Sequence, residues 1–354
     1  MHSDENNSKG FKLQFLDSDQ SKLNAWDDFV DSCSLGTFFH LSGWKTVIEK
    51  AYGHKSWFMY ATLDDRIVAV LPLVEVKSRL FGHSLVSTPF CVVGGVASDD
   101  EAAMLFLEDE AITLAEKLGV GHLELRYPFE RNNPKLIANC KHSNFSVELG
   151  EDDDAILAAV KKKQRAAIRH SLKGSLTHRI DDDVDTAFEV YSESVRNLGT
   201  PVFPKKYFQQ LRDVFGDQLD VLTVESEGQA VSSVLSFYYK GVVMPYYGGG
   251  VEAARGLKSN DYMYYKLMCS AKNERECSTF DFGRSKDDSG AYKYKRTWGM
   301  EPQPMYYKFY LAKSDELPNL SPNNPKYQFF INMWKKLPVA VSRMIGPYLS
   351  KYLG

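Results

Sequence analysis

The sequence predicts an α/β protein that consists of two tandem copies of one domain. Two observations support this prediction. The chain has 354 residues, and a single hydrophobic core rarely grows beyond about 250–300 residues. The sequence also matches itself at an offset of 163 residues, as expected after an internal duplication. Hydrophobic residues make up 44% of the chain and charged residues 25%, so each copy can bury a full core.

The first half of each copy is predicted to be a helix followed by an antiparallel hairpin. The helix ends at Gly53 in the first copy and at Gly216 in the second, where glycine is the usual residue after a helix. Alternating apolar residues then predict two strands joined by a tight turn. The paired strands are residues 57–63 with 67–74, and residues 220–224 with 230–239.

The second half of each copy combines glycines, a helix and a strand, at a shorter offset of about 155–157 residues. In the first copy, Gly94 and Gly95 precede a helix ending near Leu118 and a strand at 123–126. In the second copy, the glycines at 248–250 precede a helix at about 261–271 and a strand at 280–282. We expect residues 36–126 to superpose on residues 199–284 with the same strand order.

This order of elements is that of a GNAT-like acyltransferase domain. We therefore expect two GNAT-like domains, at residues 11–150 and 151–312, each with a mixed central sheet flanked by helices. Residues 313–354 would add a short helical tail. A helix that starts after the acidic residues 151–154 and continues to Lys173 would open the second domain.

Composition argues against several classes of function. The net charge of −3 gives no general attraction to nucleic acid, so no DNA partner is expected. The five cysteines and eight histidines lack metal-ligand spacing, and no disulfide framework is evident. The first ten residues do not resemble a signal peptide, and the longest apolar run, residues 67–74, is too short to span a bilayer. We expect a reduced, cytoplasmic protein without a metal.

A basic cluster marks the helix that opens the second domain. Residues 155–180 contain no acid, and six bases fall within 161–173: Lys161, Lys162, Lys163, Arg165, Arg169 and Lys173. The expected buried stripe of this helix is Ile156, Leu157, Val160, Ile168 and Leu172. The basic face is either a binding surface for a phosphate-rich ligand, such as tRNA or a nucleotide-linked precursor, or a solvated helix face.

Two further segments carry polar groups suited to anion binding. Residues 196–201 form a turn after a helix, in which Arg196 either binds an anion or lies at a favourable helix end. Asp281 and Arg284 follow a strand, where α/β folds place ligands. Alternation over 292–298 predicts one more strand, with Tyr292 on one face and Lys295 on the other. The alternative is that Asp281 pairs with Arg284 structurally and the aromatic residues are core.

These segments resemble the FemABX aminoacyl transferases. The resemblance lies in the strand end Asp281-Phe282-Gly283, and in the pattern Gly-x-Tyr-x-aromatic-Lys-x-x-aromatic-Gly over residues 290–299. The basic residues 163–173 are similar to the family's Lys/Arg-rich segment. Residues 196–201 with 283–285 resemble the FemAB-related subgroup found beside exosortase (PEP-CTERM) and exopolysaccharide loci. The resemblance covers about residues 11–310 and implies amide formation on a cell-envelope precursor.

The resemblance implies an N-acyltransferase that moves an acyl or aminoacyl group onto an amine of an exopolysaccharide or peptidoglycan precursor. The expected catalytic residues are Lys295, which supplies positive charge, Asp281, which orients Arg284 or takes the amine proton, and Tyr292, a hydroxyl donor. The expected substrate-binding residues are Arg196, Arg284, Ser285, Trp298, Lys163 and Arg165. No tightly bound cofactor is expected, and the donor is aminoacyl-tRNA or acyl-CoA. Residues 255–260 depart from the usual acetyl-CoA loop, which weakens the case for that donor.

Two other functions stay open. One is an acyl-CoA-dependent acetyltransferase acting on polysaccharide sugars, and the other is a non-catalytic scaffold of envelope assembly. The tail adds a possible partner, because residues 326–354 contain five bases and no acids, with apolar residues at helical spacing. This segment would either rest on an anionic membrane surface or pack onto the first domain.

Overall fold

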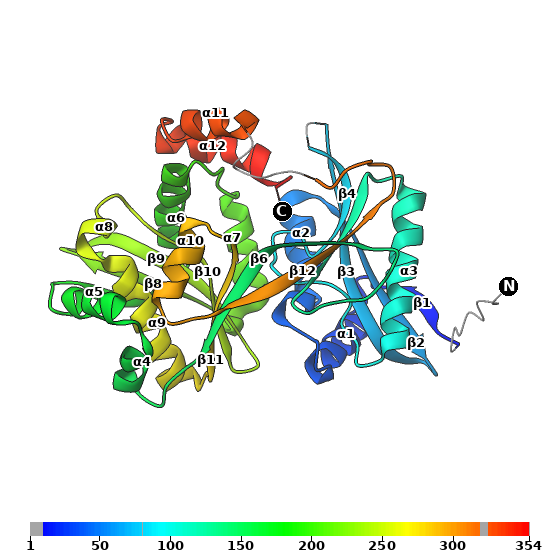
Figure 1. Cartoon of the computed structure of the whole chain (residues 1–354), viewed down its shortest axis with the longest axis horizontal. Helices are drawn as coiled ribbons and strands as arrows, with labels where there is room; N and C mark the ends of the chain where they lie inside the picture. The colour runs from blue at the N-terminus through cyan, green and yellow to red at the C-terminus, as the bar shows by residue number, and fades with distance from the viewer. Residues whose placement is uncertain (1–9, 80, 319–324, 354) are drawn as a thin grey trace. The chain divides into compact units, whose positions relative to one another are not determined.

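The computed structural model describes residues 10–79, 81–318 and 325–353 of the chain. It divides into two compact units (Figure 1). The first unit contains the chain up to residue 140 together with residues 305–318, and the second contains residues 141–304 and the tail up to residue 353. The strands of each unit are consecutive in the strand order and are called the first and the second sheet, and each unit has its own hydrophobic core.

The first unit has a six-stranded sheet covered by helices. Its strands are β1 (Lys12–Phe15), β2 (Lys55–Leu63), β3 (Arg66–Ser78), β4 (Gly82–Ser87), β5 (His122–Tyr127) and β12 (Pro302–Leu311). Its helices are α1 (Gln20–Ser32), a 3₁₀ turn η1 (Phe38–His40), α2 (Gly43–Tyr52) and α3 (Glu101–Leu118). The strand order is β1-β2-β3-β4-β5-β12. The β4–β5 pair is parallel, whereas β1–β2, β2–β3, β3–β4 and β5–β12 are antiparallel.

The second unit repeats this arrangement. Its strands are β6 (Ile137–Glu148), β7 (Thr177–Asp181), β8 (Leu219–Ser226), β9 (Gln229–Tyr239), β10 (Val242–Gly250) and β11 (Thr279–Lys286). Its helices are α4 (Asp153–Ala159), α5 (Lys162–Leu172), α6 (Asp185–Leu198), α7 (Lys205–Phe215), α8 (Ala254–Leu257), α9 (Ser259–Arg275), α10 (Gly290–Thr297), α11 (Pro325–Trp334) and α12 (Val339–Ser350), with a 3₁₀ turn η2 (Gly216–Gln218). The order is β7-β8-β9-β10-β11-β6, with only β10–β11 parallel.

The two sheets therefore have the same order and the same strand directions, which confirms the expectation of one topology in both halves. The hairpins share even their turn chemistry. Asp64 and Asp65 both have positive φ between β2 and β3, and Glu227 and Gly228 do so between β8 and β9. Two consecutive residues with positive φ are typical of the type I′ turn, whose twist matches that of the flanking strands.

One strand of each unit comes from a distant part of the chain. β12 pairs with β5, although it follows the second unit in sequence. β6 pairs with β11, although it follows β5 in sequence. The compact units therefore differ from the contiguous segments 11–150 and 151–312. Pairing depends on which sheet edge is available in space, and local sequence patterns carry no signal for that choice.

The basic segment forms two helices rather than the single helix predicted. α4 ends at Ala159, and α5 begins at Lys162 after extended backbone at Val160 and Lys161. Val160 is 3% exposed and belongs to the core of the second unit, so its burial is favoured over helix continuity. Arg165 donates from Nε and a terminal nitrogen to the Val160 carbonyl, so this carbonyl at the break is hydrogen-bonded. Leu172 is exposed and not part of the buried stripe.

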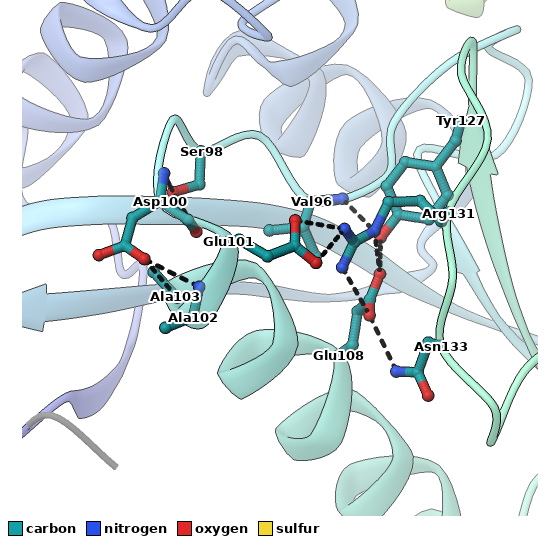
Figure 2. Close-up of polar contacts among 10 residues, drawn as sticks. All are labelled: Val96, Ser98, Asp100, Glu101, Ala102, Ala103, Glu108, Tyr127, Arg131 and Asn133. Carbon is teal, nitrogen blue, oxygen red and sulfur yellow. Dashed lines mark hydrogen bonds and ion pairs between the residues drawn. The ribbon is translucent and has the colours of Figure 1, made fainter. Parts of the chain in front are cut away.

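A buried charged network fixes the loop after β5 in the first unit (Figure 2). The Glu108 carboxylate is fully buried and accepts from the Tyr127 hydroxyl at 2.7 Å and the Asn133 amide at 2.9 Å. Two nitrogens of Arg131 donate to the same carboxylate, each at 3.1 Å, and a third donates to Glu101 at 2.6 Å. Burial and the neighbouring Glu108 charge raise the pKa of Tyr127. The buried charge of Glu108 is thus compensated by the Arg131 cation and by hydrogen bonds from Tyr127 and Asn133.

Candidate active site

The two parallel strands of the second sheet separate at their carboxyl ends. β10 and β11 pair only at Val242 with Thr279 and Val243 with Phe280. β10 then continues along β9 through an irregularity between Pro245 and Tyr247, while β11 continues along β6. Ligands of α/β folds bind beyond the carboxyl ends of parallel strands. This end of the second sheet is therefore the place to look for a site.

A half-buried carboxylate lies on β11 at this position. The Asp281 side chain accepts from the Gly283 amide at 2.8 Å and from Asn144 Nδ2 at 3.0 Å. Gly283 has a φ of +71° and lies in a register shift between Asp281 and Arg284. Burial raises the pKa of Asp281, while these two hydrogen bonds and the charge of Lys295 act in the opposite direction. A carboxylate with a raised pKa is better suited to accept a proton.

Lys295 reaches the same strand from α10. Its ammonium group donates to the carbonyl oxygens of Gly283 at 2.9 Å and Arg284 at 3.0 Å. It lies 5.3 Å from the centre of the Phe282 ring. Burial lowers the pKa of Lys295 to about 8, the Arg284 charge adds to this effect, and the Asp281 charge opposes it. Strongly perturbed groups that lie together at a strand end are candidates for catalysis.

The segment that carries Lys295 is a helix, so the predicted strand at 292–298 is wrong. The Ser289 side chain accepts from the Tyr292 amide and caps α10, which ends before Trp298. On this helix Lys293 is exposed and Lys295 is half-buried, so the two lysines do not share one face. Ser289, directly before α10, is a preferred N-cap residue and was the sequence signal that could have predicted this helix.

The other predicted residues near Lys295 have different surroundings. Tyr292 makes an edge contact with the Phe145 ring at 5.1 Å. Trp298 is 2% exposed and packs against Tyr264 and Phe282, so it belongs to the core. Asp281 makes hydrogen bonds with Asn144 and Gly283.

Two buried acceptors beside Asp281 have no hydrogen-bond partner among the described residues. They are the Asn144 Oδ1 and Ser285 Oγ atoms, which lie on the paired strands β6 and β11. Buried polar atoms of proteins are almost always satisfied, so these two are suited to contact a bound ligand. Asn144 was missed at the sequence level, because residues 137–148 were expected to belong to the first domain.

The basic face of α5 is a second candidate for ligand binding. It lines a cavity of about 550 Å³ that is formed by Lys162, Arg165, Ala166, Arg169, His170 and Lys173. On the buried side of α5, the Gln164 amide donates to Asp261 at 2.6 Å. The Tyr294 hydroxyl donates to the same Asp261 oxygen at 2.8 Å. Asp261 thus joins α5 and α10, and neither it nor Gln164 stood out in the sequence.

The remaining predicted residues are distributed over the second unit. Arg165 lines the α5 cavity, and Lys163 is exposed on the same helix. Arg196 lies at the end of α6, where it donates to the carbonyl of Lys335 in the tail at 3.2 Å. The structure therefore brings Lys295, Asp281, Arg284 and Ser285 together, and gives Arg196 a contact that stabilises the tail.

Residues 157–296 match the family model described as an acetyltransferase (GNAT) domain. The chain as a whole is similar to the structure of FemX, with 15% identity and a TM-score of 0.64, covering 90% of this chain and all of FemX. A tandem GNAT protein from the clavulanic acid biosynthesis pathway is 12% identical with a TM-score of 0.56, covering 86% of this chain and all of the other.

A third similar structure is the C-terminal domain of a putative lysylphosphatidylglycerol synthetase from Agrobacterium fabrum. It is 12% identical with a TM-score of 0.52, and the match covers 81% of this chain and 91% of that domain. A search of curated proteins finds no match. At these identities the similarity establishes the fold, and it confirms the predicted tandem GNAT-like architecture. Within the described residues, no helix is both long and apolar enough to cross a membrane.

Proposed function

We propose that this chain transfers an acyl or aminoacyl group to an amine of a cell-envelope precursor, either exopolysaccharide or peptidoglycan, in the cytoplasm. The observation that carries the proposal is the cluster of Lys295 and Asp281 at the separated ends of β10 and β11, inside the matched acetyltransferase domain. The resemblance of the flanking motifs to the FemAB-related, exosortase-associated subgroup supports the envelope substrate.

The reaction requires an amine nitrogen to attack the donor's acyl carbon. The new C–N bond forms, the C–O or C–S bond of the donor breaks, and the amine gives up one proton. Asp281 accepts this proton, since its raised pKa makes it a stronger base than an exposed aspartate. The Lys295 ammonium stabilises the oxyanion that develops on the acyl carbon's oxygen. The proton that Asp281 has taken then passes to the departing thiolate or alkoxide.

The donor is acyl-CoA or aminoacyl-tRNA, and both carry phosphate groups. The cavity on α5 presents Lys162, Arg165 and Arg169 on one face of the helix, which is an arrangement suited to phosphates. The match to an acetyltransferase domain favours acyl-CoA, and the resemblance to the FemABX transferases favours aminoacyl-tRNA. Lys163 and Arg165 keep their proposed roles in donor binding.

The donor is identified by binding measurements with the full chain at several salt concentrations. Acetyl-CoA, a long-chain acyl-CoA and aminoacyl-tRNA are the probes, and Arg169→Glu is the variant. An extended tRNA contact loses affinity steeply with salt, because each neutralised phosphate releases counterions. Lys117→Glu on α3 is the control, since this exposed lysine lies in the first unit. Equal affinity of Arg169→Glu and wild type for all probes would contradict a donor site on α5.

The catalytic proposal is tested with Lys295→Met and with Lys293→Met as the matched control on the same helix. Transfer from the identified donor to an envelope precursor extract is expected to fall about 100-fold in Lys295→Met, or about 2.7 kcal/mol. Lys295→Arg is expected to rescue poorly, because a planar guanidinium does not replace a compact ammonium. Unchanged transfer in a folded Lys295→Met protein would contradict a catalytic role of Lys295, and absence of transfer by wild type from every donor would favour the scaffold alternative. Transfer only from acyl-CoA to sugar amines would favour the polysaccharide acetyltransferase alternative.

A further inference from the structure

The tail forms two helices that belong to the second unit, so the alternative that it packs onto the first domain is wrong. α11 and α12 lie beside α6 (Figure 1). On the inner side of α12, Ser342, Gly346 and Ser350 are buried at intervals of four residues. A Cβ atom at Gly346 would lie 3.0 Å from the backbone of Val202. Small residues thus let this helix approach the unit closely.

The outer sides of the same helices expose large apolar side chains. On α11, Phe329 is 69% exposed, Phe330 is 60% exposed and Met333 is 45% exposed. On α12, Met344 is 66% exposed and Tyr348 is 74% exposed. A buried inner face normally carries the apolar residues of a surface helix, whereas here the outer faces carry them too. Large exposed apolar side chains gathered on neighbouring helices mark an interaction site.

The charged side chains of these two helices have one sign. Residues 325–353 contain no aspartate or glutamate, and Lys335 and Lys336 are exposed at the end of α11. Lys351 follows the end of α12. Helices that insert into the surface layer of a bilayer combine an apolar face with lysines that attract anionic headgroups. A polar protein partner would not require so many uncovered aromatic side chains.

We propose that α11 and α12 dock the chain on the surface of an anionic lipid bilayer. The apolar side chains enter the headgroup region, and the lysines contact the lipid phosphates. The inner contacts with α6 hold both helices in place, including the bond from Arg196 to the Lys335 carbonyl and the bond from Arg343 to the Glu189 carbonyl. This docking is independent of the proposed transfer reaction, and its test requires no substrate.

Flotation of the full chain with lipid vesicles tests the proposal. Vesicles of phosphatidylcholine alone are compared with vesicles that contain phosphatidylglycerol as well. We expect recovery with the anionic vesicles and little with the neutral ones. The variant Phe329→Ser/Phe330→Ser/Met344→Ser and the variant Lys335→Glu/Lys336→Glu should each bind at least about tenfold more weakly. Both change exposed residues only, so their melting temperatures should stay close to that of wild type.

Matched controls carry the same kinds of change elsewhere. Phe15→Ser/Ile180→Ser removes apolar residues that are 43% and 47% exposed, and Lys117→Glu/Lys141→Glu reverses two exposed lysines. Both controls should float like wild type. The proposal is overturned if wild type does not float with anionic vesicles, or if the α11–α12 variants float as well as it does. It is also overturned if these variants only abolish a concentration-dependent dimer.

Discussion

Lys295→Met should change how the stability of the protein depends on pH. Burial lowers the pKa of this lysine from 10.5 to about 8 in the folded chain. In the unfolded chain the group regains its ordinary value. Between pH 8 and 10.5 the unfolded chain therefore holds a proton that the folded chain has released. Stability rises with pH wherever the unfolded state binds more protons. This lysine therefore makes the free energy of unfolding rise between pH 8 and 10.5.

The size of the effect follows from the two pKa values. Each unit of difference corresponds to about 1.4 kcal/mol, so the full window amounts to roughly 3 kcal/mol. Below pH 8 both states carry the charge, and the folded state bears the whole desolvation cost. Above pH 10.5 neither state carries it. Methionine has a similar length and no charge. The variant therefore keeps the apolar contacts of the side chain and lacks the desolvation cost of the ammonium group.

Urea unfolding followed by tryptophan fluorescence between pH 7 and 10 measures the effect. The difference in unfolding free energy between wild type and Lys295→Met should shift by about 2–3 kcal/mol in favour of wild type as the pH rises. Lys293→Met should show the same pH dependence as wild type, because Lys293 is exposed on the same helix. Parallel curves for wild type and Lys295→Met would refute the assignment of a desolvated ammonium to this position.

Three further predictions concern other parts of the chain. If the charged form of Lys295 is active, transfer by wild type should decline as the pH rises through about 8. Lys295→Arg should lack this decline. A rise of transfer with pH would instead show that the neutral amine of Lys295 is the active form. Arg131→Met should destabilise the first unit by about 3–5 kcal/mol, since it leaves the fully buried Glu108 carboxylate without its cation. The double variant Glu108→Leu/Arg131→Met should recover much of this loss in thermal melts, and strict additivity would contradict the network. A thiol titration of the native protein should find one fast-reacting cysteine that disappears in Cys140→Ser, because the other four are buried.

Much of the fold could be predicted because it is encoded locally. Strand alternation, glycines after helices and the turns at Asp65 and Gly228 lie within short stretches, and each has its counterpart in the structure. The residue pattern around Lys295 suggested a strand, because Tyr292, Tyr294 and Arg296 alternate. Ser289 caps a helix there instead. With only eight residues, this segment was too short for periodicity to separate helix from strand.

The candidate site was predicted only in part. Lys295, Asp281, Arg284 and Ser285 come from neighbouring stretches of sequence, and the structure brings them together. Asn144 comes from a strand 137 residues before Asp281, and no sequence pattern connects the two. Arg196 seemed equally suited to the site, yet it contacts the tail. A side chain's chemistry can be known from its residue type, whereas its neighbours depend on long-range pairing.

The sequence by itself determined the duplicated α/β topology, the hairpins with their turns, and the residue types available for acyl transfer. These depend on periodicity and backbone preference within a few residues. Only the tertiary structure decided that β6 completes the second sheet, that β12 completes the first, and that Asp281 and Lys295 share a buried environment. Those outcomes depend on burial and on which sheet edges meet, and the free energy of burial is set by contacts between residues far apart in the chain.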